Sequence, residues 1–177
     1  LNLFNPLRNA IARIIVEGGF INAHSHLDRA YSLNESDLKN SKSHLFEKWE
    51  YIDKLKNTSG LNCYKERVRN GLESQKFLNT QVVCSFIDID PVVDYTALTA
   101  AHIIRDEIED ITLKIACQTL KGVVNQVPRE LLENCIDCVD IIGSLPSADP
   151  GQQAQHLDIV MGWAKQTGKR LHVHVDQ

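Results

Sequence analysis

Two histidines separated by one residue, His24 and His26, are the first side chains in the sequence that could do chemistry together. They end a short apolar run that begins after Gly18 and Gly19, which places them where a strand meets a loop. In an extended strand, residues two apart point to the same face, so both imidazoles can reach one metal ion. Zinc and ferrous iron accept neutral imidazole readily. The pair alone does not establish a metal site, because two polar residues at the entry to a loop give the same spacing.

His172 and His174 form a second pair of this spacing, in the apolar run 170–175. His174 is nearer the carboxyl end of that expected strand, at the level of the first pair, and is the candidate third ligand. His172 lies about 7 Å deeper along the strand, which favours a buried, hydrogen-bonded histidine. We therefore predict a metal site formed by His24, His26 and His174.

Gln118 and Asp88 each end an apolar run, at 111–118 and 81–88. A carboxamide donates and accepts hydrogen bonds at once, which suits the polar edge of an amide or a heterocycle. From position alone, Gln118 could equally be a hydrogen-bonded loop cap. Asp88 could orient a metal ligand, but the sequence favours a cap for the loop that begins at Pro91.

The remaining metal-binding residue types form no comparable pattern. Cys135 and Cys138 make a lone CxxC, whereas a structural zinc site needs two further ligands at matching spacing. The pattern of the zinc nucleotide deaminases, H-x-E followed by P-C-x-x-C, is absent. His44, His102 and His156 fall on expected helices, and we interpret them as surface residues.

Hydrophobic periodicity predicts strands that alternate with helices. Continuous apolar, β-branched runs are typical of buried parallel strands, and apolar residues three or four apart are typical of helices. The expected strands are 18–23, 81–88, 111–118, 138–145 and 170–175; the expected helices are 1–16, 45–56, 61–78, 94–109, 128–135 and 152–165. The polar stretch 29–43 is expected to be a long functional loop.

This alternation indicates βαβ crossovers and a parallel sheet. The two candidate architectures are a doubly wound open sheet and a (β/α)₈ barrel. No glycine-rich phosphate loop follows the first strand, and the polar residues gather at the carboxyl ends of strands, as in barrel active sites. We therefore expect one incomplete barrel domain over residues 1–177, with about the first five βα units.

Composition excludes several classes of protein. The chain has 177 residues, 43% of them hydrophobic and 24% charged, with a net charge of −4. Charges of both signs are intermixed, so there is no footprint for nucleic acid. No apolar run is long enough to cross a membrane, and five cysteines without framework spacing favour a reducing compartment. We expect a cytoplasmic protein.

Several segments, in order, resemble the cytosine deaminase-like group of the amidohydrolase superfamily. They are GFINAHSHLDRAY, LFEKWEYIDKLK, VVCSFIDID, ACQTLKG, DIIGSLP and LHVHVDQ, which together run from about Gly18 to Gln177. The HxHLD piece is specific for the superfamily, and the ordered set indicates the deaminase-like group.

The resemblance implies a distorted (β/α)₈ barrel with one divalent metal ion, zinc or iron. In that family the metal activates a water that attacks the carbon bearing the leaving amine. By position, His24, His26 and His174 would be metal ligands, and Gln118 would hold the polar edge of a pyrimidine. Gln177 occupies the position of a catalytic glutamate that shuttles protons. A glutamine there can bind a substrate but cannot act as a general acid or base.

The resemblance also implies parts that this sequence does not supply. The family takes a further histidine and a metal-binding aspartate from strands beyond the fifth, and a full barrel needs about 250 residues. We expect either a longer protein or another chain, for example a second copy, to cover the exposed barrel edges. The predicted function is a metal-dependent hydrolase or deaminase acting on a carbon–nitrogen bond of a small pyrimidine- or triazine-like heterocycle. The alternative is a catalytically incomplete chain that keeps the fold.

Overall fold

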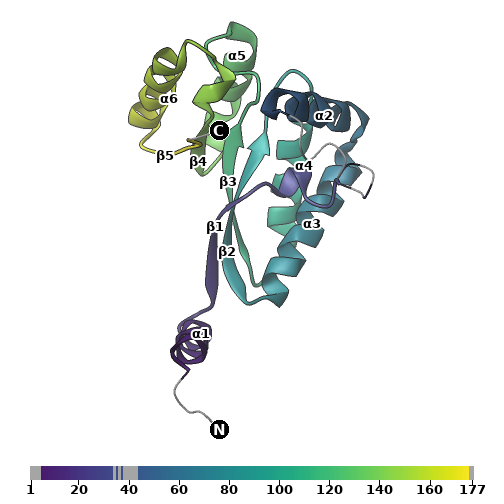
Figure 1. Cartoon of the computed structure of the whole chain (residues 1–177), viewed down its shortest axis with the longest axis vertical. Helices are drawn as coiled ribbons and strands as arrows, with labels where there is room; N and C mark the ends of the chain where they lie inside the picture. The colour runs from purple at the N-terminus through teal and green to yellow at the C-terminus, as the bar shows by residue number, and fades with distance from the viewer. Residues whose placement is uncertain (1–4, 34, 36, 38–43, 176–177) are drawn as a thin grey trace.

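The computed structural model describes residues 5–33, 35, 37 and 44–175, which form one sheet with helices between its strands (Figure 1). The strands are β1 (Phe20–Ser25), β2 (Thr80–Asp88), β3 (Thr112–Gln118), β4 (Ile141–Ser144) and β5 (Arg170–Val173); the helices are α1 (Pro6–Val16), α2 (Leu45–Thr58), α3 (Leu61–Phe77), α4 (Thr96–Glu107), α5 (Gln126–Cys135) and α6 (Gln153–Thr167). Short 3₁₀ turns occupy Leu27–Arg29, Ile136–Cys138 and Pro146–Ala148. No described helix is long and apolar enough to span a bilayer.

The strand order decides between the two predicted architectures. All four strand pairs are parallel, and the order is β1-β2-β3-β4-β5 without reversal. A doubly wound sheet reverses its order at a switch point, whereas a barrel does not. In a flat sheet, β1 and β5 would lie about 19 Å apart, four strand spacings. Ring nitrogens of His26 and His174, which directly follow these two strands, are instead 3.4 Å apart. The sheet is therefore curled into a partial barrel, as predicted.

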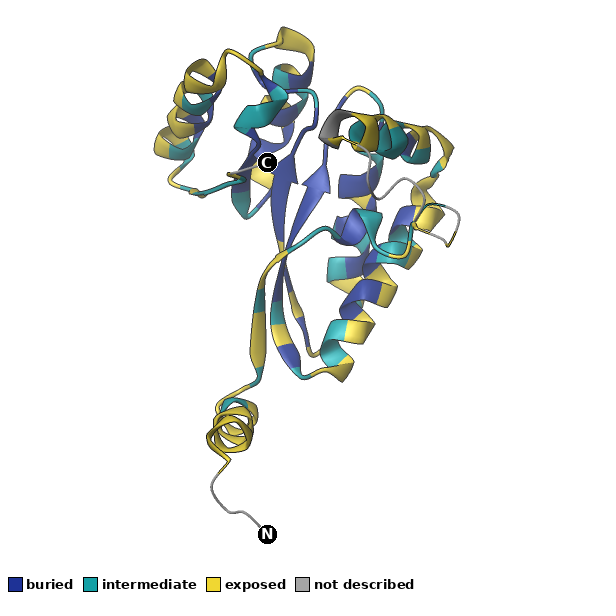
Figure 2. Cartoon of the chain, viewed as in Figure 1, coloured by how far each residue is buried: buried dark blue, intermediate teal, exposed yellow. Residues whose placement is uncertain are grey.

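The two faces of the sheet differ in what they bury. On the outer face, strand residues such as Val83, Ile87 and Ile115 join the main core with the buried sides of α3, α4, α5 and α6 (Figure 2). On the inner face, a small cluster of Cys84, Phe86 and Ala116 lies under the histidines. The curled sheet thus presents its polar side chains at the mouth of a narrow interior.

Local signals explain most element boundaries. The Asn5 side chain accepts hydrogen bonds from the backbone N–H groups of Leu7 and Arg8, and Pro6 follows it, so α1 begins at Pro6 and not at residue 1 of the expected range. Gly168, with φ of 70°, ends α6 in the left-handed conformation. The helix expected over 94–109 begins later, at Thr96. Asp94 has a φ of 50°, and its N–H closes a turn onto the carbonyl of Asp90.

Helix α1 lies apart from the sheet at one end of the molecule (Figure 1). None of its residues is buried, and Leu7 and Val16 are among its exposed apolar side chains. In the described part of the chain, β1 and β5 each pair with one neighbour, so both outer strands have an unpaired side.

Gly143 is required where β4 approaches β3. A Cβ there would collide with the carbonyl oxygen of Cys117 and lie 2.8 Å from a ring carbon of Phe86. We expect Gly143→Ala to lower the free energy of unfolding by about 3 kcal/mol, the upper part of the usual range for overpacking. Gly162→Ala, in α6 with open space around the added atom, should instead be neutral or stabilising by up to about 1 kcal/mol. Denaturant unfolding of both variants tests this, and equal stability would contradict the close approach.

Candidate metal centre

Three of the predicted site residues converge at the carboxyl ends of the outer strands. His24 lies in β1, His26 directly follows it, and His174 directly follows β5. One ring nitrogen from each lies within 4.8 Å of the others. This convergence links segments about 150 residues apart and requires the curl of the sheet. The three histidines could hold a metal ion.

Hydrogen bonds decide where the protons of two of these rings lie. The Ser144 carbonyl lies 3.2 Å from Nδ1 of His174, and a carbonyl only accepts, so Nδ1 carries the proton and Nε2 the lone pair. Arg29 Nη2 lies 2.7 Å from Nδ1 of His26, and a guanidinium only donates. Nε2 of a neutral His26 therefore carries a proton, which it donates to His174 Nε2 at 3.4 Å.

The donor set fits a divalent metal. Two nitrogens about 2.1 Å from a shared tetrahedral ion lie about 3.4 Å apart, which is the separation between His26 Nε2 and His174 Nε2. Burial lowers the pKa of all three histidines, and that of His26 falls to about 3 through burial, then Arg29. Neutral rings are what a metal requires. For Nε2 of His26 to bind an ion, its proton would have to move to Nδ1, and Arg29 would have to give up its hydrogen bond there.

His172 and Phe86 complete the surroundings of the three histidines. His172 Nε2 lies 3.3 Å from Nδ1 of His24, so the predicted hydrogen bond is present, but His172 is only half-buried. The Phe86 ring has its centre 4.4 to 5.3 Å from the ring centres of His24, His26, His172 and His174. It forms an apolar floor that sequence analysis did not single out.

Beside the histidines is a pocket of about 250 Å³ that contains Gln118. The Gln118 side chain is 2% exposed, and its Nε2 donates to Asp88 Oδ1 at 3.1 Å. Its Oε1 has no hydrogen-bond partner among the described residues, so a buried acceptor remains available. Among the described contacts, the amide bonds to Asp88 and not to the backbone of the following loop. Besides Gln118, the pocket is lined by His26, Arg29, Lys48, Trp49, Ile52, Leu120, Leu145 and His174.

Asp88 belongs to a buried charge cluster and does not cap a loop, which corrects the prediction. Its carboxylate lies 2.9 Å from Lys56 Nζ and 3.4 Å from Arg29 Nη2. Asp90 is the cap instead, because its Oδ1 accepts from the backbone N–H groups that follow Pro91. Burial would raise the pKa of Asp88, but Arg29 and Lys56 outweigh it and hold that pKa below its usual value. Burial and the neighbouring Asp88 raise the pKa of Asp28 to about 6.

Other predicted features lie elsewhere or take no part. Gln177 is outside the described residues. Cys135 is buried and Cys138 exposed, both as free thiols. His44 is exposed as predicted, and His102 is half-buried. The prediction of a surface position for His156 is wrong, since this side chain is buried.

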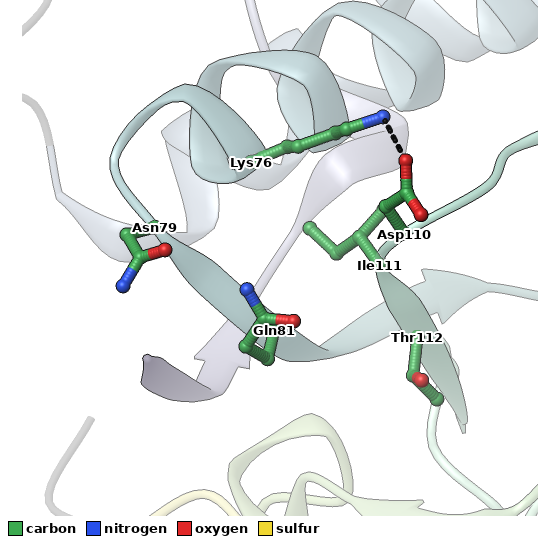
Figure 3. Close-up of a pocket in the computed structure, with 6 residues that line it drawn as sticks. All are labelled: Lys76, Asn79, Gln81, Asp110, Ile111 and Thr112. Atoms are coloured by element: carbon green, nitrogen blue, oxygen red, sulfur yellow. Dashed lines mark ion pairs between the residues drawn. The ribbon is translucent and has the colours of Figure 1, made fainter. Parts of the chain in front are cut away.

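A larger hollow, of about 530 Å³, lies at the opposite ends of the strands (Figure 3). Lys76 and Asp110 pair across it at 3.3 Å, and Asn79, Gln81 and Thr112 supply its other polar groups. It contains no histidine or cysteine, and the amino-terminal side of a barrel is its stabilising face. The histidine pocket is the better candidate site despite its smaller volume.

Comparison with solved structures identifies the architecture. A crystal structure of 5-methylcytosine deaminase from Klebsiella pneumoniae with 5-fluorocytosine superposes with a TM-score of 0.80 at 23% identity, over 88% of this chain and 38% of that one. N-isopropylammelide isopropylaminohydrolase from Burkholderia multivorans gives a TM-score of 0.74 at 18% identity, over 90% and 40% of the two chains. The chain has the fold of part of an amidohydrolase barrel. In this partial barrel, the histidine cluster lies at the carboxyl ends of β1 and β5.

Sequence comparison finds a curated relative whose name states no activity. No protein-family model matches the sequence. An uncharacterized protein of Haemophilus influenzae is 37% identical over 169 residues, which are 93% of this chain and 61% of that protein. The chain therefore spans less than two thirds of this relative, and about two fifths of the solved proteins that it resembles.

Proposed function

We propose that the chain is the metal-binding part of a hydrolase that cleaves a carbon–nitrogen bond of a small, aminated heterocycle. The observation that carries this proposal is the pocket lined by His26 and His174 of the histidine cluster together with Gln118, whose buried amide oxygen has no hydrogen-bond partner among the described residues. The names of the two solved relatives, a deaminase of 5-methylcytosine and an aminohydrolase of N-isopropylammelide, support the reaction class.

Each residue has a distinct part in this proposal. His24, His26 and His174 would hold one zinc or iron ion, which when bound supplies Lewis-acid activation of a water. Gln118 accepts a hydrogen bond from the ring N–H or amino group of the substrate, and Asp88 keeps its amide in that orientation. Trp49 offers an apolar wall to a planar ring. The three-imidazole donor set accommodates either metal.

A second candidate is a catalytically incomplete chain that keeps the amidohydrolase fold. Two observations favour it. The metal-capable cluster among the described residues is made of histidines alone, without a carboxylate. At the position of the family's catalytic glutamate the sequence has Gln177, which cannot transfer protons at neutral pH.

Ammonia release from metal-loaded protein separates the two candidates. Protein loaded with zinc or ferrous iron is incubated with cytosine, 5-methylcytosine and aminated triazines, and ammonia is measured by a coupled assay. Turnover that disappears in the His24→Ala/His26→Ala variant supports the hydrolase. Stoichiometric metal without turnover of any of these compounds supports the incomplete chain.

Gln118→Leu is expected to lower kcat/KM for an accepted substrate about 10- to 100-fold, because one hydrogen bond to the heterocycle is lost. The metal content should not change, since Gln118 is not a member of the histidine cluster. Leu120→Met, a swap of similar volume in the same pocket, should change kcat/KM less than about threefold. An unaltered kcat/KM for Gln118→Leu would show that the amide does not contact the substrate.

A further inference from the structure

A buried chain of three side chains connects α6 to the end of β4. Nε2 of His156 lies 3.0 Å from the Ser144 hydroxyl, and its Nδ1 lies 2.7 Å from Asp149 Oδ2. A carboxylate only accepts, so Nδ1 of His156 donates to Asp149 and Nε2 accepts the hydroxyl proton of Ser144. The order Asp–His–Ser is that of a hydrolytic triad.

This triad is not placed to attack a substrate. Ser144, Asp149 and His156 are 2%, 6% and 1% exposed, and none of them lines the pocket beside the histidines. In the sheet register, Gly143 pairs with His172 and Ser144 with Val173, so the Ser144 side chain faces the helix layer, away from the barrel interior. The three residues must act on something other than a bound molecule.

The backbone carbonyl of Ser144 holds His174 in place. This one oxygen accepts from the backbone N–H of His174 at 2.9 Å and from His174 Nδ1 at 3.2 Å. The second bond keeps the proton of His174 on Nδ1 and leaves Nε2 with its lone pair toward His26. The peptide of Ser144 therefore decides both the orientation of the His174 ring and the nitrogen that is free.

Asp149 anchors the other end of the chain. Its Oδ2 also accepts from the backbone N–H groups of Val123, at 2.7 Å, and Val124, at 3.3 Å. A side chain on Gly122, whose φ is 72°, would collide with the Asp149 carboxylate. The triad is thus fixed to the loop after β3, the strand that ends at Gln118, and cannot shift without moving that loop.

We propose that Ser144, His156 and Asp149 are positioning residues, which hold the Ser144 carbonyl so that His174 presents Nε2 to a metal ion. This inference rests on the proposed metal-binding function. Partners of a ligating histidine beyond the metal itself are typically worth a 10- to 100-fold change in metal affinity. The triad is connected to the imidazole of His174 through the backbone carbonyl of Ser144.

Two variants and one control test the proposal. Ser144→Ala removes the hydroxyl with little change in volume, and His156→Gln removes the link to Asp149. Val160→Ala, one turn along the same buried face of α6, destabilises the helix contact without touching the triad. Imidazole ¹⁵N spectra report the tautomer of His174, and competition with a chromogenic chelator reports zinc affinity, both under conditions where each variant is folded.

We expect wild type and Val160→Ala to show His174 protonated at Nδ1 with equal zinc affinity. Ser144→Ala and His156→Gln should show a mixture of tautomers and zinc affinity lowered at least about 10-fold. Unchanged His174 spectra in both triad variants would overturn the proposal, as would an equal loss of affinity in Val160→Ala. If wild type binds no zinc, the proposed function fails, and the tautomer spectra still decide the positioning role.

Discussion

Zinc affinity is expected to fall at least about 100-fold in the His24→Ala/His26→Ala variant, since even the outer partners of a metal ligand are worth 10- to 100-fold. These two residues supply two of the three ring nitrogens that lie within 4.8 Å of one another. The remaining imidazole of His174 cannot hold an ion tightly by itself. Elemental analysis of the purified protein and chelator competition measure the change, with about one zinc or iron per wild-type chain as the reference.

The matched control removes two imidazoles from elsewhere. His44 is exposed and His102 half-buried, and neither belongs to the histidine cluster. His44→Ala/His102→Ala should keep the metal content and affinity of wild type. Equal metal content in wild type and both double variants would mean that the ion binds elsewhere, and metal absent from all three after supplementation would refute the site.

The position of the histidines at one edge of the sheet could be predicted from sequence, because it depends only on period and direction. Two HxH pairs at the ends of parallel strands must meet at the same edge of a sheet. The curl that brings His26 to His174 depends on strand order, which no local pattern contains. Polar residues at strand ends favoured a barrel, and the unreversed order of five strands decided it.

The buried position of His156 could have been predicted from the sequence, although its two partners in the triad could not. His156, Val160 and Trp163 are spaced by four and three residues and form the buried side of α6. A polar residue on the apolar side of a helix requires a buried partner, so the spacing excluded a surface position for His156. Its partners Ser144 and Asp149 could not be identified, because they come from the preceding strand and loop.

Asp88 shows where local reasoning reaches its limit. A carboxylate that ends a strand is a reasonable loop cap, and Asp90, two residues later, has that role. Asp88 has a different role because it pairs with Lys56 on α2, more than thirty residues away. The ammonium of Lys56 lies between the carboxylates of Asp88 and Asp90. Such a pairing depends on how a helix lies over the sheet, and helical periodicity contains no information about it.

Lys56→Met should lower the free energy of unfolding by about 3–5 kcal/mol, the usual effect of removing one partner from a buried ion pair. The Lys56 side chain is 3% exposed, and its Nζ lies 2.9 Å from Asp88 and 2.5 Å from Asp90. Methionine fills similar space but leaves Arg29 as the remaining cation that pairs with Asp88 among the described residues. Denaturant unfolding at pH 7 measures the loss, which should exceed that of any surface charge variant.

Lys114→Met provides the control, because Lys114 pairs with Asp140 at 3.1 Å with half of its side chain exposed. An exposed pair contributes at most about 1 kcal/mol, so this variant should remain close to wild type. Equal unfolding free energies for the two variants would show that Lys56 is not paired inside the protein.

Acidic pH should reduce the difference in unfolding free energy between wild type and Lys56→Met. In wild type, Arg29 and Lys56 hold the pKa of Asp88 below its ordinary value of 3.8, although burial opposes them. The stabilisation from an acid with a lowered pKa is complete above the ordinary value and is lost as the pH falls through the folded-state value. The Lys56→Met variant lacks most of this stabilisation at every pH. The unfolding free energies of wild type and Lys56→Met should therefore converge below about pH 4. A difference between them that stays constant down to pH 2.5 would mean that Lys56 stabilises the fold through its aliphatic contacts and not through its charge.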